Sequence, residues 1–166
     1  MDKELELKLV EKYPKILKDY GGDPMHTSMC FGFQHENGWL ELIEKCLEKL
    51  QYFCDLCSKD GREVQVVATT IKEKLSSLRF YYYVEGANEI ENDIIDDIVS
   101  EAERKSEYTC EVSGESGVCC KKWGWLKTLS YKEARKLGYV ACDEETEKYW
   151  QEKDAKLATG DKTEED

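Results

Sequence analysis

Residues 63–84 read EVQVVATTIKEKLSSLRFYYYV, and this stretch decides the fold. β-Branched and aromatic residues dominate both halves, and side chains alternate with the period of two that is typical of strands. A polar break at Ser76-Ser77 separates the halves. We therefore expect residues 63–74 and 78–84 to form an antiparallel β-hairpin that turns at Ser76-Ser77 and is closed by Gly86.

Helical periodicity flanks this hairpin on both sides. Apolar residues recur at spacings of three and four within residues 3–20, 37–57 and 88–106, which predicts three amphipathic helices. Pro14 should kink the first helix or begin a second short one, and the run GGDP at 21–24 should stop it. The predicted fold class is therefore α+β, with N-terminal helices, a central antiparallel hairpin and a third helix.

The regular spacing of apolar residues ends after residue 108, where cysteine, glycine and tryptophan interrupt the pattern. Ser130 and Glu133 form a capping-box pattern, which predicts a short helix that ends at Gly138. Residues 143–157 predict a last helix. We expect three parts: a core domain over 1–108, a small irregular, ribbon-like module with short C-terminal helices over 109–157, and a disordered acidic tail over 158–166.

The chain carries a formal net charge of −12 over 166 residues. Because sequence-independent binding of long DNA or RNA requires many neutralised phosphates, this charge argues against it, and it also argues against binding to an anionic membrane surface. No apolar run approaches the roughly 18 residues of a transmembrane helix, and the N-terminus lacks the basic start of a signal peptide. We therefore expect a cytosolic protein whose eight cysteines are reduced.

One segment, which we name the basic island, reverses this charge. Residues 119–136 contain six lysines and arginines and one acid, together with Trp123 and Trp125. Cations beside flat aromatic faces suit the phosphate and the base of a nucleotide. The alternative interpretation is a basic surface helix that balances acidic neighbours. The island indicates a binding site for a small anionic ligand, in which Trp125 and Lys127 are candidate contacts.

A second cationic group lies on the predicted hairpin. Lys72 and Lys74 share one face by the period of two, and Arg79 shares its parity with Tyr81. Arginine can grip a phosphate with two donors, and tyrosine offers a stacking ring. The alternative is an exposed face whose lysines discourage edge pairing. The predicted ligand-binding residues are Lys72, Lys74, Arg79, Tyr81, Trp125 and Lys127, with Trp39 as a candidate wall.

No catalytic constellation stands out in the sequence. Cys54-x-x-Cys57 has the spacing of half a zinc site, although burial of both cysteines as small hydrophobic residues competes with that interpretation. Its partners would have to come from Cys110, Cys119 and Cys120. The two histidines, His26 and His35, lack the local signature of a Cys/His hydrolase. We expect no enzymatic activity, no cofactor and no bound metal.

The chain resembles a family of small bacteriophage proteins across about residues 4–130. The motifs that carry the resemblance are EKYPK at 11–15, GGDP at 21–24, FGF at 31–33, NGW at 37–39, IKEKL at 71–75 and LRFYY at 78–82. In that family a segment similar to TCEV at 109–112 opens a zinc-ribbon-like module, and a Trp and a Thr-Leu-Cys follow. Here Trp125 and Thr128-Leu129 match them.

The chain departs from the family at the metal ligands. The family's second and third cysteines fall at Ser113 and Ser130, and the partner expected three positions later is Glu133. Because serine hydroxyls replace zinc thiolates poorly, the resemblance implies a degenerate, metal-free ribbon held by packing of Trp123 and Trp125. Cys119 or Cys120 could restore only a partial site.

Phage proteins of this size often act against host defences, and one strategy is a sponge that sequesters the cyclic nucleotide signals of systems such as CBASS. The resemblance implies such a sponge, which would bind a cyclic di- or oligonucleotide in the host cytosol without catalysis. Two copies could close around a symmetric ligand, although the sequence does not establish a homodimer. Two alternatives remain open. One is an acidic inhibitor of a host defence enzyme, in which the helix over 88–106 imitates phosphate charge, and the other is a degenerate zinc-ribbon protein associated with nucleic acid.

Overall fold

The computed structural model describes residues 1–59 and 61–159 and confirms the predicted α+β class. Short 3₁₀ turns occupy Ser28–Phe31 and Asn37–Trp39. The other elements are α1 (Lys3–Lys12), α2 (Leu40–Cys57), β1 (Gln65–Lys74), β2 (Ser77–Glu85), α3 (Glu89–Ser106), β3 (Val118–Lys122), β4 (Trp125–Leu129), α4 (Tyr131–Leu137), β5 (Val140–Ala141) and α5 (Glu144–Thr159).

The predicted hairpin is confirmed, with β1 and β2 paired antiparallel from Gln65 opposite Glu85 to Lys74 opposite Ser77. The turn lies one residue earlier than predicted, because its two central residues are at positions 75 and 76. They have φ values of 54° and 62°, both in the left-handed region that a two-residue type I′ turn requires.

A register shift between Ala68 and Thr70 interrupts the regular alternation of inward-facing and outward-facing side chains along β1. Such a bulge reverses which side chains face the core. Ile71 therefore joins Val66 and Ala68 in the buried cluster, although strict alternation would place it on the opposite face.

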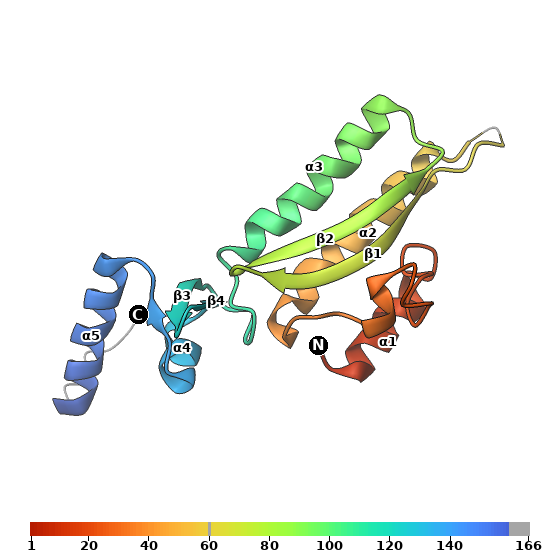
Figure 1. Ribbon diagram of the computed structural model, residues 1–166. Coiled ribbons are helices and arrows are strands. Elements are labelled where there is room, and N and C mark those ends of the chain that lie inside the picture. The colour runs from red at the N-terminus through yellow and green to blue at the C-terminus, as the bar shows by residue number, and fades with distance from the viewer. Residues whose placement is uncertain (60, 160–166) are drawn as a thin grey trace.

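Helices α2 and α3 run alongside the long hairpin and cover one face of it (Figure 1). Both predicted helices are confirmed; α2 starts at Leu40 after a 3₁₀ turn, and Asn88 caps α3 through a capping box with Glu91. Their apolar stripes meet the hairpin in the main core. Its fully buried members include Ile43, Leu47 and Leu50 of α2, Ile95 of α3, and Ile71 and Leu78 of the hairpin.

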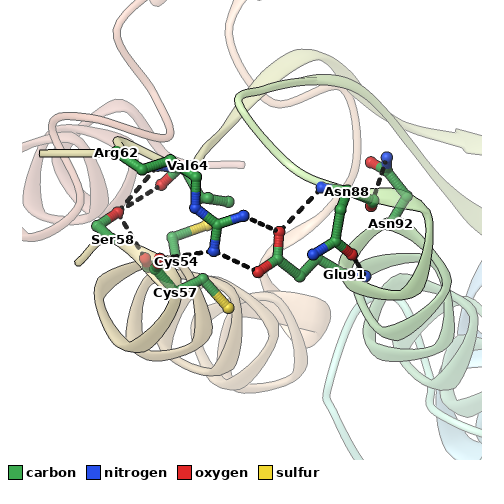
Figure 2. Close-up of polar contacts among 8 residues, drawn as sticks. All are labelled: Cys54, Cys57, Ser58, Arg62, Val64, Asn88, Glu91 and Asn92. Atoms are coloured by element: carbon green, nitrogen blue, oxygen red, sulfur yellow. Dashed lines mark hydrogen bonds and ion pairs between the residues drawn. The ribbon is translucent and has the colours of Figure 1, made fainter. Parts of the chain in front are cut away.

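An ion pair fastens the end of α2 to the start of α3 (Figure 2). The Arg62 guanidinium donates to the two carboxylate oxygens of Glu91 at 2.9 and 2.6 Å and to the Cys57 carbonyl at 3.0 Å. Glu91 also accepts a hydrogen bond from the backbone N–H of Asn88 at 2.9 Å. Since Glu91 is buried and all of these donors converge on it, the contact fixes the spacing of the two helices at this end.

The predicted first helix is too long. Helix α1 ends at Lys12, and Tyr13 leaves the helical region with φ −125° and ψ 55°. The reason is Pro14, because a proline disfavours the helical conformation of the residue before it. Residues 14–21 form turns, in which Ile16 is still fully buried, and the Ala68 N–H donates to the Ile16 carbonyl at 2.9 Å. The N-terminal segment, residues 1–39, thereby covers the outer edge of β1 with its turns at 14–21.

Side chains of α3 satisfy the outer edge of β2. The backbone N–H of Leu78 donates to the hydroxyl of Ser106 at 2.7 Å, and that of Phe80 donates to the carboxylate of Glu103 at 2.9 Å. The Ser106 hydroxyl in turn donates to the Glu103 carbonyl at 2.5 Å. These contacts replace the third strand that the edge would otherwise recruit.

A second, smaller core holds the C-terminal module together at the turn end of the hairpin (Figure 1). Strand β3 pairs with β4 on one side and with β5 on the other. The predicted short helix is confirmed as α4, capped by Ser130 and ended by Gly138 in the left-handed conformation. The buried residues of this core are Cys110, Cys120, Leu129, Ala134, Ala141 and Trp150.

The predicted last helix is confirmed as α5, which continues two residues past the predicted end, through Thr159. The first two residues of the predicted disordered tail, 158 and 159, are therefore helical. The rest of that prediction, over 160–166, lies outside the described residues.

We predict that Ser106→Ala lowers the free energy of unfolding by about 1–3 kcal/mol, because it leaves the buried N–H of Leu78 without an acceptor. Urea unfolding measures the difference. Ser100→Ala on the same helix is the matched control and should change the free energy by less than about 0.5 kcal/mol. Equal effects of the two substitutions would contradict the edge role of Ser106.

Candidate functional site

A groove with a volume of about 640 Å³ opens beside the β3–β4 hairpin and α4. We name it the tryptophan groove. Its volume falls within the range of about 300–1,000 Å³ that is typical of small-molecule sites. Its lining residues are Glu36, Val112, Lys122, Trp123, Trp125, Lys127, Glu133, Lys136, Leu137 and Tyr139.

Two indole rings stand exposed at the groove. Trp123 is 90% exposed and Trp125 is 74% exposed, so the prediction that they hold the module together by packing is wrong; Trp150 fills the module's core instead. Trp123 also has φ 49° at the β3–β4 turn, followed by Gly124 at 87°. Asparagine or glycine is favoured at this turn position, and a bulky side chain there is strained. Neither packing nor turn chemistry therefore explains Trp123.

Lys122 lies between two of the aromatic rings. Its ammonium group is 4.8 Å from the Trp123 ring centre and 5.7 Å from that of Tyr139. It donates to the Leu137 carbonyl at 2.5 Å, which ties β3 to the end of α4. A cation held within about 6 Å of two aromatic faces combines charge with stacking surface in one place.

Lys127 lines the groove but is already paired. Its ammonium group lies 2.7 Å from the carboxylate of Glu111, whose side chain is 2% exposed. Burial disfavours the charge on Lys127, but the hydrogen bond to Glu111 and the negative charges of Glu111, Glu36 and Glu73 together outweigh it and raise the pKa of Lys127. The second carboxylate oxygen accepts from the Glu36 N–H at 3.2 Å. Lys127 is therefore held in place in the groove wall, and the buried carboxylate of Glu111 neutralises its charge.

The groove's remaining charges come from Lys122 and Lys136 on the positive side and from Glu36 and Glu133 on the negative side. Lys136 is 70% exposed and lies 3.4 Å from Glu133, whose side chain is 18% exposed; at this distance, with an exposed lysine, the pair contributes little stability. Lys136 can therefore change partner at small cost and reach an incoming anion.

The predicted hairpin residues form a separate patch on the outer face of β1 and β2. Lys72 lies directly opposite Arg79, and its ammonium group is 5.9 Å from the Tyr81 ring centre. Arg79 donates to the Leu78 carbonyl at 2.9 Å, and Lys74 is exposed next to the turn. The structure gathers these four residues, and it gathers Trp125 with Lys127, but none of the four lines the tryptophan groove.

The prediction of Trp39 as a wall of the site is wrong. Its side chain is fully buried in the main core, and its indole N–H donates to the Thr109 carbonyl at 2.7 Å. Sequence reasoning also left Lys122, Lys136 and Tyr139 out of the site. The signal for the first two was their place in the basic island, whereas nothing local marks Tyr139.

The positions to which the resemblance assigns zinc ligands lie close together. Burial favours the neutral thiol of Cys110, but hydrogen bonds from Ser113 and from the backbone N–H groups of Ser113, Ser130 and Val112 outweigh it and lower its pKa. The Ser113 N–H is 3.4 Å from the sulfur. Glu133 instead donates its backbone N–H to the Ser130 hydroxyl at 3.4 Å. The Cys110 sulfur is thus held by backbone donors.

Cys54 and Cys57 lie at the end of α2 (Figure 2). Cys54 is fully buried in the main core, as the hydrophobic interpretation predicts. Burial and the neighbouring Glu91 carboxylate raise the pKa of Cys57. Over residues 1–59 and 61–159, no group of three or more His, Cys, Asp or Glu side chains is arranged to hold a metal ion.

His35 is a buried titratable residue next to Glu36, which lines the tryptophan groove. It is 6% exposed and lies between Phe33 and Trp39, whose ring centres are 6.0 and 5.7 Å away. Nδ1–H donates to the Glu36 carbonyl at 2.7 Å, whereas Nε2 has no partner in the part of the chain that the structure describes. Burial lowers the pKa of His35 to about 4, so the ring is neutral at pH 7.

No protein-family model matches the chain, and no curated protein or solved structure matches it. The resemblance to small phage proteins therefore stays a prediction. Within the described residues, no helix has both the length and the apolar character that crossing a membrane requires.

We predict that protonation of His35 destabilises the fold at acid pH. The unfolded chain protonates this histidine near pH 6.5 and the folded chain only near 4, so the stability is complete above pH 6.5 and is lost as the pH falls to about 4. The lowered pKa corresponds to about 3 kcal/mol.

Urea unfolding between pH 7 and 4 checks this prediction. Between pH 7 and 4, the free energy of unfolding of His35→Phe should fall by about 3 kcal/mol less than that of the wild type. The titration of carboxylates contributes equally in both proteins, so the difference reports His35 alone. His26→Gln, at the exposed second histidine, is the control and should keep the wild-type profile. Parallel profiles for wild type and His35→Phe would show that His35 is not buried as described.

Proposed function

We propose that this protein is a non-catalytic binding protein that captures a small, flat, anionic ligand in the tryptophan groove, and that the ligand is a cyclic di- or oligonucleotide. The observation that carries the proposal is Lys122, held between the rings of Trp123 and Tyr139 beside the exposed Trp125. A nucleotide pairs a planar base with a phosphate, and this arrangement pairs aromatic faces with an ammonium group.

The energetics of the free groove favour a stacking ligand. The rings of Trp123 and Trp125 leave large apolar surfaces in water, and burial of such surface is favourable. Stacking of a base on an aromatic side chain contributes about 1–3 kcal/mol. Lys122 and Lys136 supply the charges for phosphate, since Lys127 is occupied by Glu111.

The size and charge of the groove favour a small ligand over a polymer. The groove is a local feature of about 640 Å³ on a chain with net charge −12, so a long nucleic acid would meet repulsion beyond it. Lys122 and Lys136 balance Glu36 and Glu133 in the groove lining, so within a Debye length of about 8 Å a small anion meets two lysines without the net repulsion of the surrounding acidic surface. Together with the resemblance to small phage proteins, this supports a sponge that sequesters a cyclic nucleotide signal in the host cytosol.

We predict that a member of a cyclic di- and oligonucleotide panel raises the melting temperature of the purified protein, and that calorimetric titration gives the affinity. Trp125→Ala and Lys136→Ala should each weaken binding by about 1–3 kcal/mol through loss of a stack or of a charged hydrogen bond. Lys132→Ala is the matched control for Lys136→Ala, because Lys132 is an exposed lysine that lies on α4 like Lys136 but does not line the groove.

Trp123→Asn separates binding from folding. It places Asn-Gly at the β3–β4 turn, which is a favoured type I′ sequence, so the free energy of unfolding should stay equal or rise while ligand affinity falls. Recovery of intact ligand from the denatured complex would distinguish a sponge from a hydrolase. A panel without any thermal shift would contradict the proposal, and pull-down of a host enzyme in that case would favour the acidic inhibitor.

A further inference from the structure

Two thiols of the C-terminal module lie in direct contact. Cys119 is on β3 and Cys142 follows β5, and their sulfur atoms are 3.0 Å apart. The backbone fixes this contact, because the Cys142 N–H donates to the Cys119 carbonyl at 2.9 Å and the next residues, Cys120 and Ala141, are paired across the two strands. All eight cysteines are free thiols, and among the described residues this is the one pair with a sulfur–sulfur contact.

Cys119 is the member of this dithiol that lines a surface groove. A groove of about 290 Å³ opens onto it, formed by the turn of the β1–β2 hairpin, the end of α3 with the residues that follow it, and the start of β3, with Leu75 and Tyr108 exposed at its rim. Both thiols of the pair are partly exposed, whereas the adjacent Cys120 is fully buried in the small core. A small solute can therefore reach Cys119 without any opening of the fold.

The surroundings assign different roles to the two sulfurs. The Ser76 hydroxyl lies 2.7 Å from the Leu75 carbonyl and 3.4 Å from the Cys119 sulfur, so its single O–H can turn from the carbonyl to an anionic sulfur at this position. Burial and the neighbouring Cys119 raise the pKa of Cys142 to about 11, which favours its protonated form. Because the groove opens onto Cys119, this sulfur meets an oxidant first, and Cys142 at 3.0 Å is placed to resolve the product.

We propose that Cys119 and Cys142 form a redox-active dithiol that a hydroperoxide converts to an intramolecular disulfide. The Cys119 thiolate attacks one oxygen of hydrogen peroxide, the O–O bond breaks, and the leaving hydroxide takes up a proton to become water. Cys119 is then a sulfenic acid. The Cys142 sulfur attacks it, the S–S bond forms, the S–O bond breaks, and a second water leaves with the Cys142 proton. The two sulfurs supply the two electrons that reduce the peroxide.

The disulfide needs little movement and changes the module in a defined way. The sulfurs approach from 3.0 Å to a bond length of about 2.05 Å across strands that are already hydrogen-bonded. The bond joins positions 23 residues apart and so links β3 to the start of α5. Because such a cross-link restricts the unfolded chain, the oxidised protein should melt at a higher temperature.

The experiment treats the full chain with hydrogen peroxide and maps its peptides by mass spectrometry without reduction. We expect the mass of the chain to fall by two hydrogens, Cys119 to be joined to Cys142 by fragment assignment, and dithiothreitol to reverse both changes. The melting temperature should rise by about 5 °C or more on oxidation and return on reduction. This wild-type measurement needs no variant to fold.

Variants assign the chemistry to these two residues. Cys119→Ser and Cys142→Ser should each abolish the cross-link, and Cys142→Ser should leave Cys119 as a sulfenic acid that dimedone traps. Cys30→Ser removes another partly exposed thiol and should leave the cross-link unchanged. A disulfide between other cysteines, overoxidation of Cys119 while Cys142 stays reduced, or intact thiols at peroxide levels that oxidise the unfolded chain would each overturn the proposal.

Discussion

The buried carboxylate of Glu111 is the contact on which the arrangement of the two cores depends. Its oxygens accept from Lys127 of β4 at 2.7 Å and from the backbone of Glu36 at 3.2 Å, so one side chain joins the C-terminal module to the N-terminal segment. The backbone repeats the link, since Gly38 donates to the Glu111 carbonyl at 2.7 Å. Only glycine fits at position 38, because a Cβ atom there would collide with the carbonyl groups of Cys110 and Glu111.

This junction shapes the tryptophan groove, and β3 connects the groove to the dithiol. Glu36 and Lys127 both line the groove, and both contact the carboxylate of Glu111. A shift of either residue would therefore disturb the environment of this buried charge. Strand β3 carries Lys122 at one end and Cys119 near the other. Trp123 has a strained backbone conformation and an exposed ring. Backbone strain of this kind is retained mainly at functional sites, where the surrounding structure compensates for its energy.

Local periodicity and capping were enough to predict the hairpin, α2 to α5 and the fold class, because these features depend on near neighbours in sequence. The errors have non-local or competing causes. The turn at Leu75 and Ser76 depends on docking of Ser76 against Thr128, and the pairing of Lys127 depends on Glu111, sixteen residues away. Burial of Trp39 could have been predicted, because it directly precedes α2 and lies four residues before the buried Ile43, in line with the helix's apolar stripe. The composition of the basic island indicated the site, whereas the outward orientation of its tryptophans required the structure.

A double-mutant cycle between Glu111 and Lys127 tests most directly whether this buried ion pair stabilises the junction at the tryptophan groove. The free energy of unfolding is measured for wild type, Glu111→Gln, Lys127→Met and the double variant. The account predicts that each single change leaves a partner unpaired and that the double change costs less than the sum, with a coupling of about 2 kcal/mol or more. Additive effects, within about 0.5 kcal/mol, would show that the two side chains are not coupled and that the groove does not depend on this pair.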